Sequence, residues 1–299
     1  MSLKSFHMPN LSPSGGGPHI FGERLRQELI NIGLTYTKDA LNQLNLIDGS
    51  RQEGRHNILR LDGLYFEKSH PQNQSIFRAH KDFDHIVFQG EFCRLQYEAF
   101  TGIIKSHSII PNGVPDSFFE THPPAFKSEF EKVLIASASW RRHKRIEEVI
   151  DAFKSSRLQD VLLVILGGCK GPELPNVAYL PVLPPHELPS YYQSADAMVH
   201  LAWLDWCPNT VVEGLASGLP VLCSHNGGTK ELVKDDGIIL ELEEDYVIGT
   251  ELDLYTPPPI SLDPLIKGIL QILYMPKIKR RNDLKINDIA LQYNTLFKS

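Results

Sequence analysis

Two carboxylates in the second half of the chain are spaced so that they could act together at the start of a helix. Asp205 and Glu213 are separated by seven residues in DWCPNTVVE, between an apolar strand and a helix that ends near Ser217. A helix N-terminus exposes free N–H groups and a positive dipole end, so Asn209 and Thr210 could receive a diphosphate. Glu213 could then accept hydrogen bonds from vicinal ribose hydroxyls, and Asp205 could reach a transferred sugar. Taken alone, the pair is better explained by the preference of acids for helix starts.

Basic residues come shortly before these acids. Arg141, Arg142 and Lys144 lie in SWRRHKR, directly after a predicted strand. Arginine offers a planar fork and lysine a compact charge, and both can neutralise a leaving diphosphate. For this segment alone, a solvated basic loop is an equally good interpretation.

Two features of the first half could face the same ligand. Gly16 and Gly17 belong to a glycine triplet between the opening strand and a helix, so their backbone could approach a phosphate or sugar closely. Asp62 ends a buried strand in RLDG, where a charged side chain has reason to face a cleft. A carboxylate that caps nearby backbone is the alternative for Asp62. The triplet is neither a dinucleotide fingerprint nor a Walker loop.

Alternating strands and helices must position these residues. In the first half we predict strands at 4–8, 56–66, 83–88 and 108–110, and helices at 19–32 and 91–102. The first helix has an apolar face formed by Ile20, Leu25, Leu29 and Ile32. The stretch 34–56 is polar and predicts no clear element. Residues 115–127 contain three prolines and are predicted to form a linker.

The alternation in the second half is clearer. Strands are predicted at 132–138, 161–167, 177–180, 197–201, 220–224 and 237–240, with helices between them and a helical tail from Leu262. Such alternation is typical of parallel sheets, with a cleft at the carboxyl ends of the strands. We predict an acceptor-side domain at 1–122, a donor-binding domain at 123–260, and C-terminal helices at 261–299 that pack back toward the first domain.

The region around the two acids resembles the signature of glycosyltransferase family 4. The stretch DAMVHLAWLDWCPNTVVEGLASGLPVL, from Asp196, matches that family's pattern without a gap, and GGTKELV at 227–233 matches its Gly-Gly-x-x-Glu-Leu-Val segment. The resemblance implies an α/β protein of the GT-B fold, in which two Rossmann-like β/α/β domains face each other across a cleft. It also favours the functional interpretation of Glu213 and of the glycine loop.

The chain departs from the family pattern at three positions. Asp205 stands where the family has Glu, and Ser139 stands where it more often has Arg. Asp62 replaces a His that contacts the donor sugar in relatives, so the resemblance implies that Asp62 bonds the sugar or stabilises positive charge at the anomeric carbon. Lys144 falls on the family Lys, and the arginine role passes to Arg141 or Arg142. Base contacts are expected from the backbone near Val182.

The resemblance implies a retaining glycosyltransferase. The donor would be a UDP- or GDP-linked sugar, and the acceptor a hydroxyl of a glycan, lipid-linked sugar or cell-surface polysaccharide, with no metal and no cofactor. A nucleotide-sugar 2-epimerase is the nearest alternative enzyme. A non-catalytic GT-B subunit is the alternative from another class, motivated by the three departures.

Bulk properties limit the partners and the location. The formal net charge is -6 and the pI is about 6.1, which gives no overall attraction to nucleic acid. The four cysteines form no Cys-x-x-Cys pair and suit a reducing cytoplasm. No apolar run reaches the ~20 residues of a membrane span. The basic segment 277–281 (KIKRR) could make weak peripheral contact with acidic lipids at the inner membrane face, although it fits a solvated helix face better.

Overall fold

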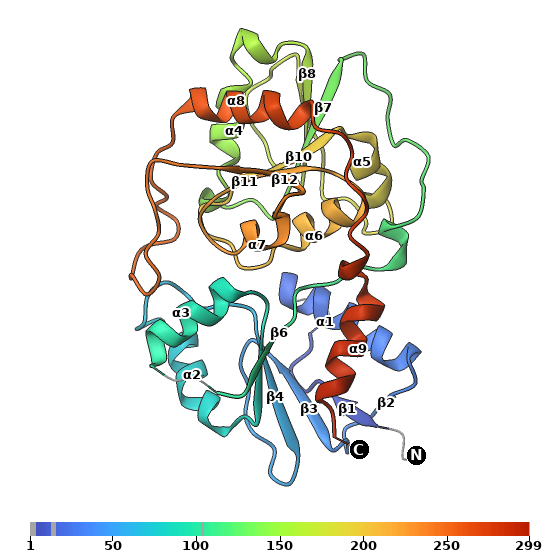
Figure 1. The fold of residues 1–299 in the computed structure, drawn as a ribbon, viewed down its shortest axis with the longest axis vertical. Coiled ribbons are helices and arrows are strands. Elements are labelled where there is room, and N and C mark those ends of the chain that lie inside the picture. The colour runs from blue at the N-terminus through green and yellow to red at the C-terminus, as the bar shows by residue number, and fades with distance from the viewer. Residues whose placement is uncertain (1–3, 13–15, 103–104, 299) are drawn as a thin grey trace.

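A computed structural model describes residues 4–12, 16–102 and 105–298, and it divides the protein into two domains stacked along its long axis (Figure 1). Each domain contains one six-stranded sheet. All strand pairs within both sheets are parallel. The two Rossmann-like domains predicted from the alternation of strands and helices are therefore present.

The first sheet has the strand order β2-β1-β3-β4-β5-β6. Its strands are β1 (Ser5–His7), β2 (Thr35–Tyr36), β3 (Asn42–Leu46), β4 (His56–Leu61), β5 (His85–Phe88) and β6 (His107–Ile109). The helices of this half are α1 (Gly17–Asn31), α2 (Pro71–Ala79) and α3 (Glu91–Thr101), with a 3₁₀ turn at His80–Asp82. A parallel sheet is buried on both faces, and helices provide this cover.

Helix α1 begins directly after Gly16, and a proline lies in its first turn. Proline suits this position because the N–H that it lacks would have no intrahelical partner there. Leu25 and Leu29 are buried as predicted, but Ile20 is 48% exposed, and the neighbouring Phe21 is buried in its place. The predicted apolar face is thus wrong in the first turn, where α1 faces the gap between the domains.

The polar stretch 34–56 contains two strands that its composition does not predict. All five residues of β3 (NQLNL) are buried, and β2 forms the edge of the sheet. Helix α2 is a further element without a predicted counterpart. Period-based prediction fails on β3 because its buried side chains are largely amides rather than aliphatic groups.

The second sheet has the order β12-β11-β10-β7-β8-β9. Its strands are β7 (Lys132–Ser137), β8 (Val161–Leu166), β9 (Val177–Tyr179), β10 (Ala197–His200), β11 (Val221–Ser224) and β12 (Gly237–Leu240). Its helices are α4 (Ile146–Ala152), α5 (Leu188–Ser194), α6 (Asn209–Ala216), α7 (Thr229–Val233) and α8 (Leu262–Leu273). Shorter 3₁₀ turns lie at Asp116–Phe118, Arg142–Lys144, Ser156–Leu158 and Asn282–Leu284. These strands follow the predicted positions closely.

The C-terminal segment serves both domains. Helix α8 packs against α4 and β12 of the second domain, whereas α9 (Ile286–Leu296) packs against α1 of the first (Figure 1). Of the C-terminal helices that we expected on the first domain, α9 lies there, whereas the apolar face of α8 completes the second core.

The basic segment 277–281 lies in the connection between α8 and α9. Lys277 and Arg280 donate to the carbonyl oxygens of Ala195 and Phe119. Arg281 bonds the carbonyl of Leu232 at 2.9 Å and also the carboxylates of Asp236 and Asp283. Three of its cations thus attach the connection to the rest of the chain, and contact with acidic lipid remains a prediction.

Candidate active site

The candidate residues of the second domain lie where its sheet reverses direction. β7 and β10 are neighbours in the sheet although β8 and β9 separate them in the chain. In open α/β sheets, ligands bind outside the carboxyl ends of the strands at this switch point. The segment after β7 carries Lys144, and the segment after β10 carries Asp205 and leads into α6. The topology therefore brings these residues to one place.

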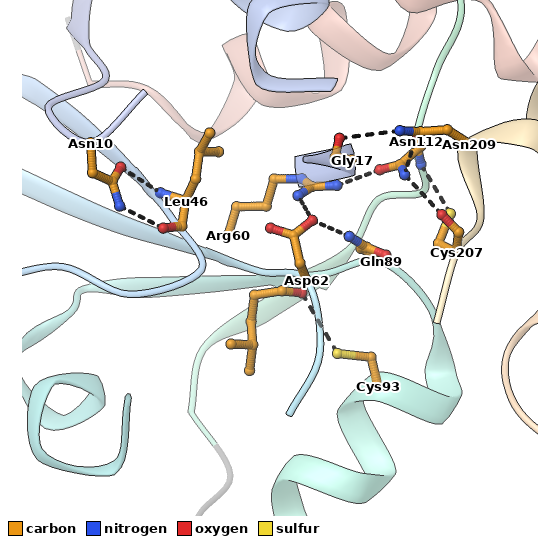
Figure 2. A network of polar contacts seen from close by, with 11 residues as sticks. Asn10, Gly17, Leu46, Arg60, Asp62, Gln89, Cys93, Asn112, Cys207 and Asn209 are labelled. Atoms are coloured by element: carbon orange, nitrogen blue, oxygen red, sulfur yellow. Dashed lines mark hydrogen bonds and ion pairs between the residues drawn. The ribbon is translucent and has the colours of Figure 1, made fainter. Parts of the chain in front are cut away.

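Two helix N-termini meet across the gap between the domains. The side-chain amide of Asn209, the first residue of α6, donates to the carbonyl oxygen of Gly17 at the start of α1, at 3.1 Å (Figure 2). The first amides of each helix, with Thr210 in the first turn of α6, have no intrahelical partner, so positive dipole ends converge here. A Cβ atom at Gly16 would meet no described atom within 4 Å, so this side of the junction is open. Gly15 lies outside the described residues.

Glu213 is the most constrained carboxylate of the junction. It is only 4% exposed, and its Oε1 accepts a hydrogen bond from Arg24 Nη2 of α1 at 2.7 Å. Its Oε2 accepts from the Tyr192 hydroxyl of α5 at 3.1 Å. Burial, and then the charge of Glu213, raise the pKa of Tyr192 well above its ordinary value, so this hydroxyl keeps its proton. A carboxylate has about four acceptor positions, which leaves Glu213 able to receive further donors.

Asp205 is held by three protein groups. Its Oδ2 accepts from Lys144 Nζ and, at 3.0 Å, from His200 Nε2, while its Oδ1 accepts from the backbone N–H of Trp206 at 3.0 Å. Burial alone would raise the pKa of Asp205, but Lys144 and His200 together hold it well below its usual range. Burial lowers the pKa of His200. Asp205 is therefore an ionised anchor for Lys144, and its contact with a transferred sugar remains a prediction.

Asp62 belongs to a buried network that crosses the domains (Figure 2). Its Oδ1 accepts from Arg60 and from Gln89, and the other end of Arg60 donates to the side-chain oxygen of Asn112. The amide of Asn112 then donates at 2.8 Å to Asn209 Oδ1 of α6. Burial raises the pKa of Asp62, although Arg60 opposes the shift. Its Oδ2 is buried without a partner among the described residues, so it can accept one more donor.

The three basic residues after β7 separate in the structure. Lys144 turns inward to Asp205, whereas Arg142 turns to Glu148 of α4 at 2.7 Å. Arg141 is exposed. Of the two arginines proposed for the diphosphate, Arg141 is therefore the one without an ion pair among the described residues. Val182 is 77% exposed and lies beside Gly168, where the loops after β8 and β9 meet.

The chain resembles known proteins both in sequence and in fold. Residues 118–245 match the model of the family described as glycosyl transferases group 1. This range contains β7 to β12 and every candidate residue of the second domain. The match spans the second domain, which is therefore similar to the group 1 glycosyl transferases.

Solved structures extend the likeness to the fold of the whole chain. A sucrose-phosphate synthase from Thermosynechococcus elongatus superposes with a TM-score of 0.72 at 13% identity, covering 98% of this chain and 97% of that one. Anabaena HepE in complex with UDP and glucose gives 0.64 at 12% identity, with 98% of each chain covered. WaaG, a glycosyltransferase involved in lipopolysaccharide biosynthesis, gives 0.63 at 13% identity over 98% and 95%. These likenesses confirm the predicted GT-B fold. No curated protein matches the chain in sequence.

The Gly-Gly turn at Gly227 and Gly228 packs against the loop that holds Asp205. The amide of Gly228 donates to the carbonyl of Asp205 at 2.8 Å. Gly227 has a φ of +81°, and a Cβ at Gly228 would collide with the carbonyl oxygen of Trp206. Only glycine fits this approach, which gives a physical reason for the turn in the GGTKELV segment.

Side chains that sequence reasoning missed close one side of the interdomain gap. The Trp206 ring stacks on Phe66 with centroids 5.1 Å apart and also contacts Phe92, and Tyr246 contacts both phenylalanines. The carboxylate of Glu231 accepts from the amides of Glu91 and Phe92 at the start of α3, each at 2.7 Å. Phe66, Phe92 and Glu91 come from the first domain, so only the folded chain brings them to these partners.

Arg24, Tyr192 and His200 are further contacts of the site that sequence reasoning did not assign. The acidic partners Glu213 and Asp205 were predicted, but nothing in the spacing of these three residues points to them. Among the described residues, no group of three His, Cys, Asp or Glu side chains could hold a metal ion. No helix among the described residues is both long and apolar enough to cross a bilayer.

Proposed function

We propose that the protein is a retaining glycosyltransferase of the family 4 type, which moves a sugar from a UDP- or GDP-linked donor to a hydroxyl of a glycan, a lipid-linked sugar or a cell-surface polysaccharide. The observation that carries the proposal is the junction of α1 and α6, where buried Glu213 lies within the same helix whose N-terminus faces Gly17. Complexes of Anabaena HepE with UDP-glucose and with UDP and glucose provide precedent for such a donor in this fold.

The diphosphate is proposed to lie against the amides of Asn209 and Thr210. A negative group is stabilised there by the free N–H groups and the helix dipole. The ribose hydroxyls then donate to Glu213, which keeps acceptor capacity beside its bonds to Arg24 and Tyr192. Gly16 leaves the space next to the phosphates open.

Bond cleavage at the anomeric carbon leaves negative charge on the diphosphate. Lys144 and Arg141 are the cations of the second domain that would stabilise this charge, together with the N-terminus of α6. The free Oδ2 of Asp62 is the acceptor proposed for the donor sugar. The acceptor hydroxyl attacks from the face of the leaving group and passes its proton to the leaving phosphate. No metal or cofactor takes part in this proposal.

Ribose recognition gives the sharpest test. In calorimetric titrations, UDP and GDP are compared with their 2′,3′-dideoxy forms. Whichever of UDP and GDP binds the wild-type protein more tightly should bind about 10- to 100-fold more tightly than the dideoxy form of the same nucleotide, because the ribose hydroxyls donate hydrogen bonds to a carboxylate. Glu213→Gln and Glu213→Ala should remove most of this discrimination. Equal discrimination in the variants would refute the ribose assignment, and circular dichroism confirms that each variant is folded.

Product analysis tests the reaction itself. Incubation with UDP- and GDP-sugars should release nucleotide, and NMR of the transferred sugar should show the donor's anomeric configuration. Epimerised donor would establish the nucleotide-sugar 2-epimerase instead. Nucleotide binding without any turnover would favour a non-catalytic subunit.

A further inference from the structure

Arg24 lies on the second turn of α1 and reaches across the domain boundary. Its Nη2 contacts Glu213 Oε1 at 2.7 Å, and the side chains of the pair are only 11% and 5% exposed. The guanidinium lies 5.9 Å from the centre of the Phe118 ring in the linker. The first domain therefore contributes a cation to the residue proposed to hold the ribose.

Arg24 Nη1 is buried and has no partner among the described residues. A buried charged donor left without a hydrogen bond is costly, so the position calls for an acceptor from outside the chain. In a nucleoside diphosphate, only a methylene and an ester oxygen separate the ribose ring from the first phosphorus. A group that touches the ribose-binding carboxylate is thus within reach of the diphosphate.

Most of the neighbouring cations already have a carboxylate partner. Lys144 is paired with Asp205 and Arg142 with Glu148, while Arg60 is fully buried between Asp62 and Asn112. Arg141 is exposed. Diphosphate carries more than one negative charge, so a second cation from the opposite domain complements the charge that the second domain supplies.

We propose that Arg24 is a donor-binding residue of the first domain, whose Nη2 fixes the carboxylate of Glu213 while its Nη1 donates to the diphosphate of the donor. The proposal rests on the proposed nucleotide-sugar site. A donor held in this way bonds both domains at once, so its binding favours the closed arrangement of the two sheets.

The test compares nucleotides with and without phosphates. UDP, GDP, uridine and guanosine are titrated calorimetrically into the wild type, Arg24→Met and Arg24→Lys. Arg24→Met should weaken binding of the diphosphate about 10- to 100-fold, because a charged hydrogen bond is lost. Nucleoside affinity should fall much less. Arg24→Lys should lie between, since it keeps the charge but lacks the fork.

Arg26→Met is the matched control. Arg26 lies on the same helix and pairs with Glu23 at the surface, so this variant should bind every probe like the wild type. An equal loss for nucleoside and diphosphate in Arg24→Met would mean that Arg24 only positions Glu213, and would overturn the proposal. Tighter binding would show instead that Arg24 blocks the ribose position, and unchanged binding would also overturn it.

The two proposals fail in different ways. If the wild type binds neither UDP nor GDP, the nucleotide-sugar function itself is wrong. If the wild type binds but Arg24→Met binds the diphosphate equally well, only the role of Arg24 is wrong. Melting temperatures of all variants show whether any loss comes from unfolding.

Discussion

The two sheets bury their inner strands with different chemistry. In the second sheet, β8 has the sequence VLLVIL and packs through aliphatic side chains in the core that also contains α4 and α8. In the first sheet, β3 has the sequence NQLNL, yet all five of its residues are buried. A parallel sheet requires cover on both faces, but that cover need not be apolar when most polar groups find partners. In β3, Asn42 and Gln43 have side-chain partners, whereas Asn45 Nδ2 is buried without one among the described residues.

The amides of β3 act as cross-links between distant segments. Asn42 Nδ2 donates to the carbonyl oxygens of Ser5 and Lys298, at 2.8 and 3.0 Å, and its Oδ1 accepts from the amide of Lys298. Gln43 contacts His7 of β1 at 3.1 Å. The first domain thus ties its two chain ends to its central strand through polar contacts, whereas the second domain relies on aliphatic packing.

The polar network of the first domain should show its largest effect at Asp62. Asp62→Ala removes the carboxylate partner of Arg60, which is fully buried, and should lower the free energy of unfolding by about 3–5 kcal/mol. Urea denaturation measures the change. The double variant Arg60→Met/Asp62→Leu should recover much of the loss, because no unpaired charge remains. A loss below about 1 kcal/mol for Asp62→Ala would contradict this view of the network.

Asn42→Leu makes β3 more like β8 and should nevertheless destabilise the protein. The substitution leaves the Ser5 carbonyl and both backbone groups of Lys298 without their side-chain partner, at a cost of about 1–3 kcal/mol in unfolding free energy. Leu44→Met in the same strand keeps volume and polarity and should cost less than about 1.5 kcal/mol. Equal or greater stability of Asn42→Leu would show that apolar cover alone suffices for this strand.

His143 gives the second domain an effect on stability that appears only as the pH falls below neutral. Burial, then Lys144, lower the pKa of His143 to about 4, below the value of about 6.5 in an unfolded chain. The unfolded state therefore binds the proton more readily, so His143 contributes stability above pH 6.5 that is lost as the pH falls toward 4. His143→Phe keeps an aromatic ring against Tyr255. Between about pH 4 and 6.5, the melting temperature of this variant should depend less on pH than that of the wild type. If the melting temperature of the variant depends on pH as steeply as that of the wild type, His143 does not cause the pH dependence.

The second domain, with its aliphatic strands, was easier to predict from the sequence than the first domain, with its buried amides. In the second domain, the positions of the strands, the start of α6 and the acids Asp205 and Glu213 could be read from apolar periodicity and motif spacing. In the first domain, β2, β3 and α2 escaped prediction, because amides and short polar turns carry no period that separates strand from loop. The contacts of Asp62 with Arg60 and Gln89, and of Arg60 with Asn112, depend on the ends of three neighbouring strands, which are far apart in the chain.

The sequence by itself determined the alternation of strands and helices, the parallel sheets, and the glycosyltransferase signature from Asp196 to Val233, because these depend on local periodicity and on residues close together in the chain. Only the tertiary structure decided which cation meets which acid. Arg24 reaches Glu213 from the other domain, Lys144 and His200 share Asp205, and Arg142 turns away to Glu148. Such pairs depend on how distant segments pack in the folded chain, and the spacing of residues in the sequence does not predict this packing.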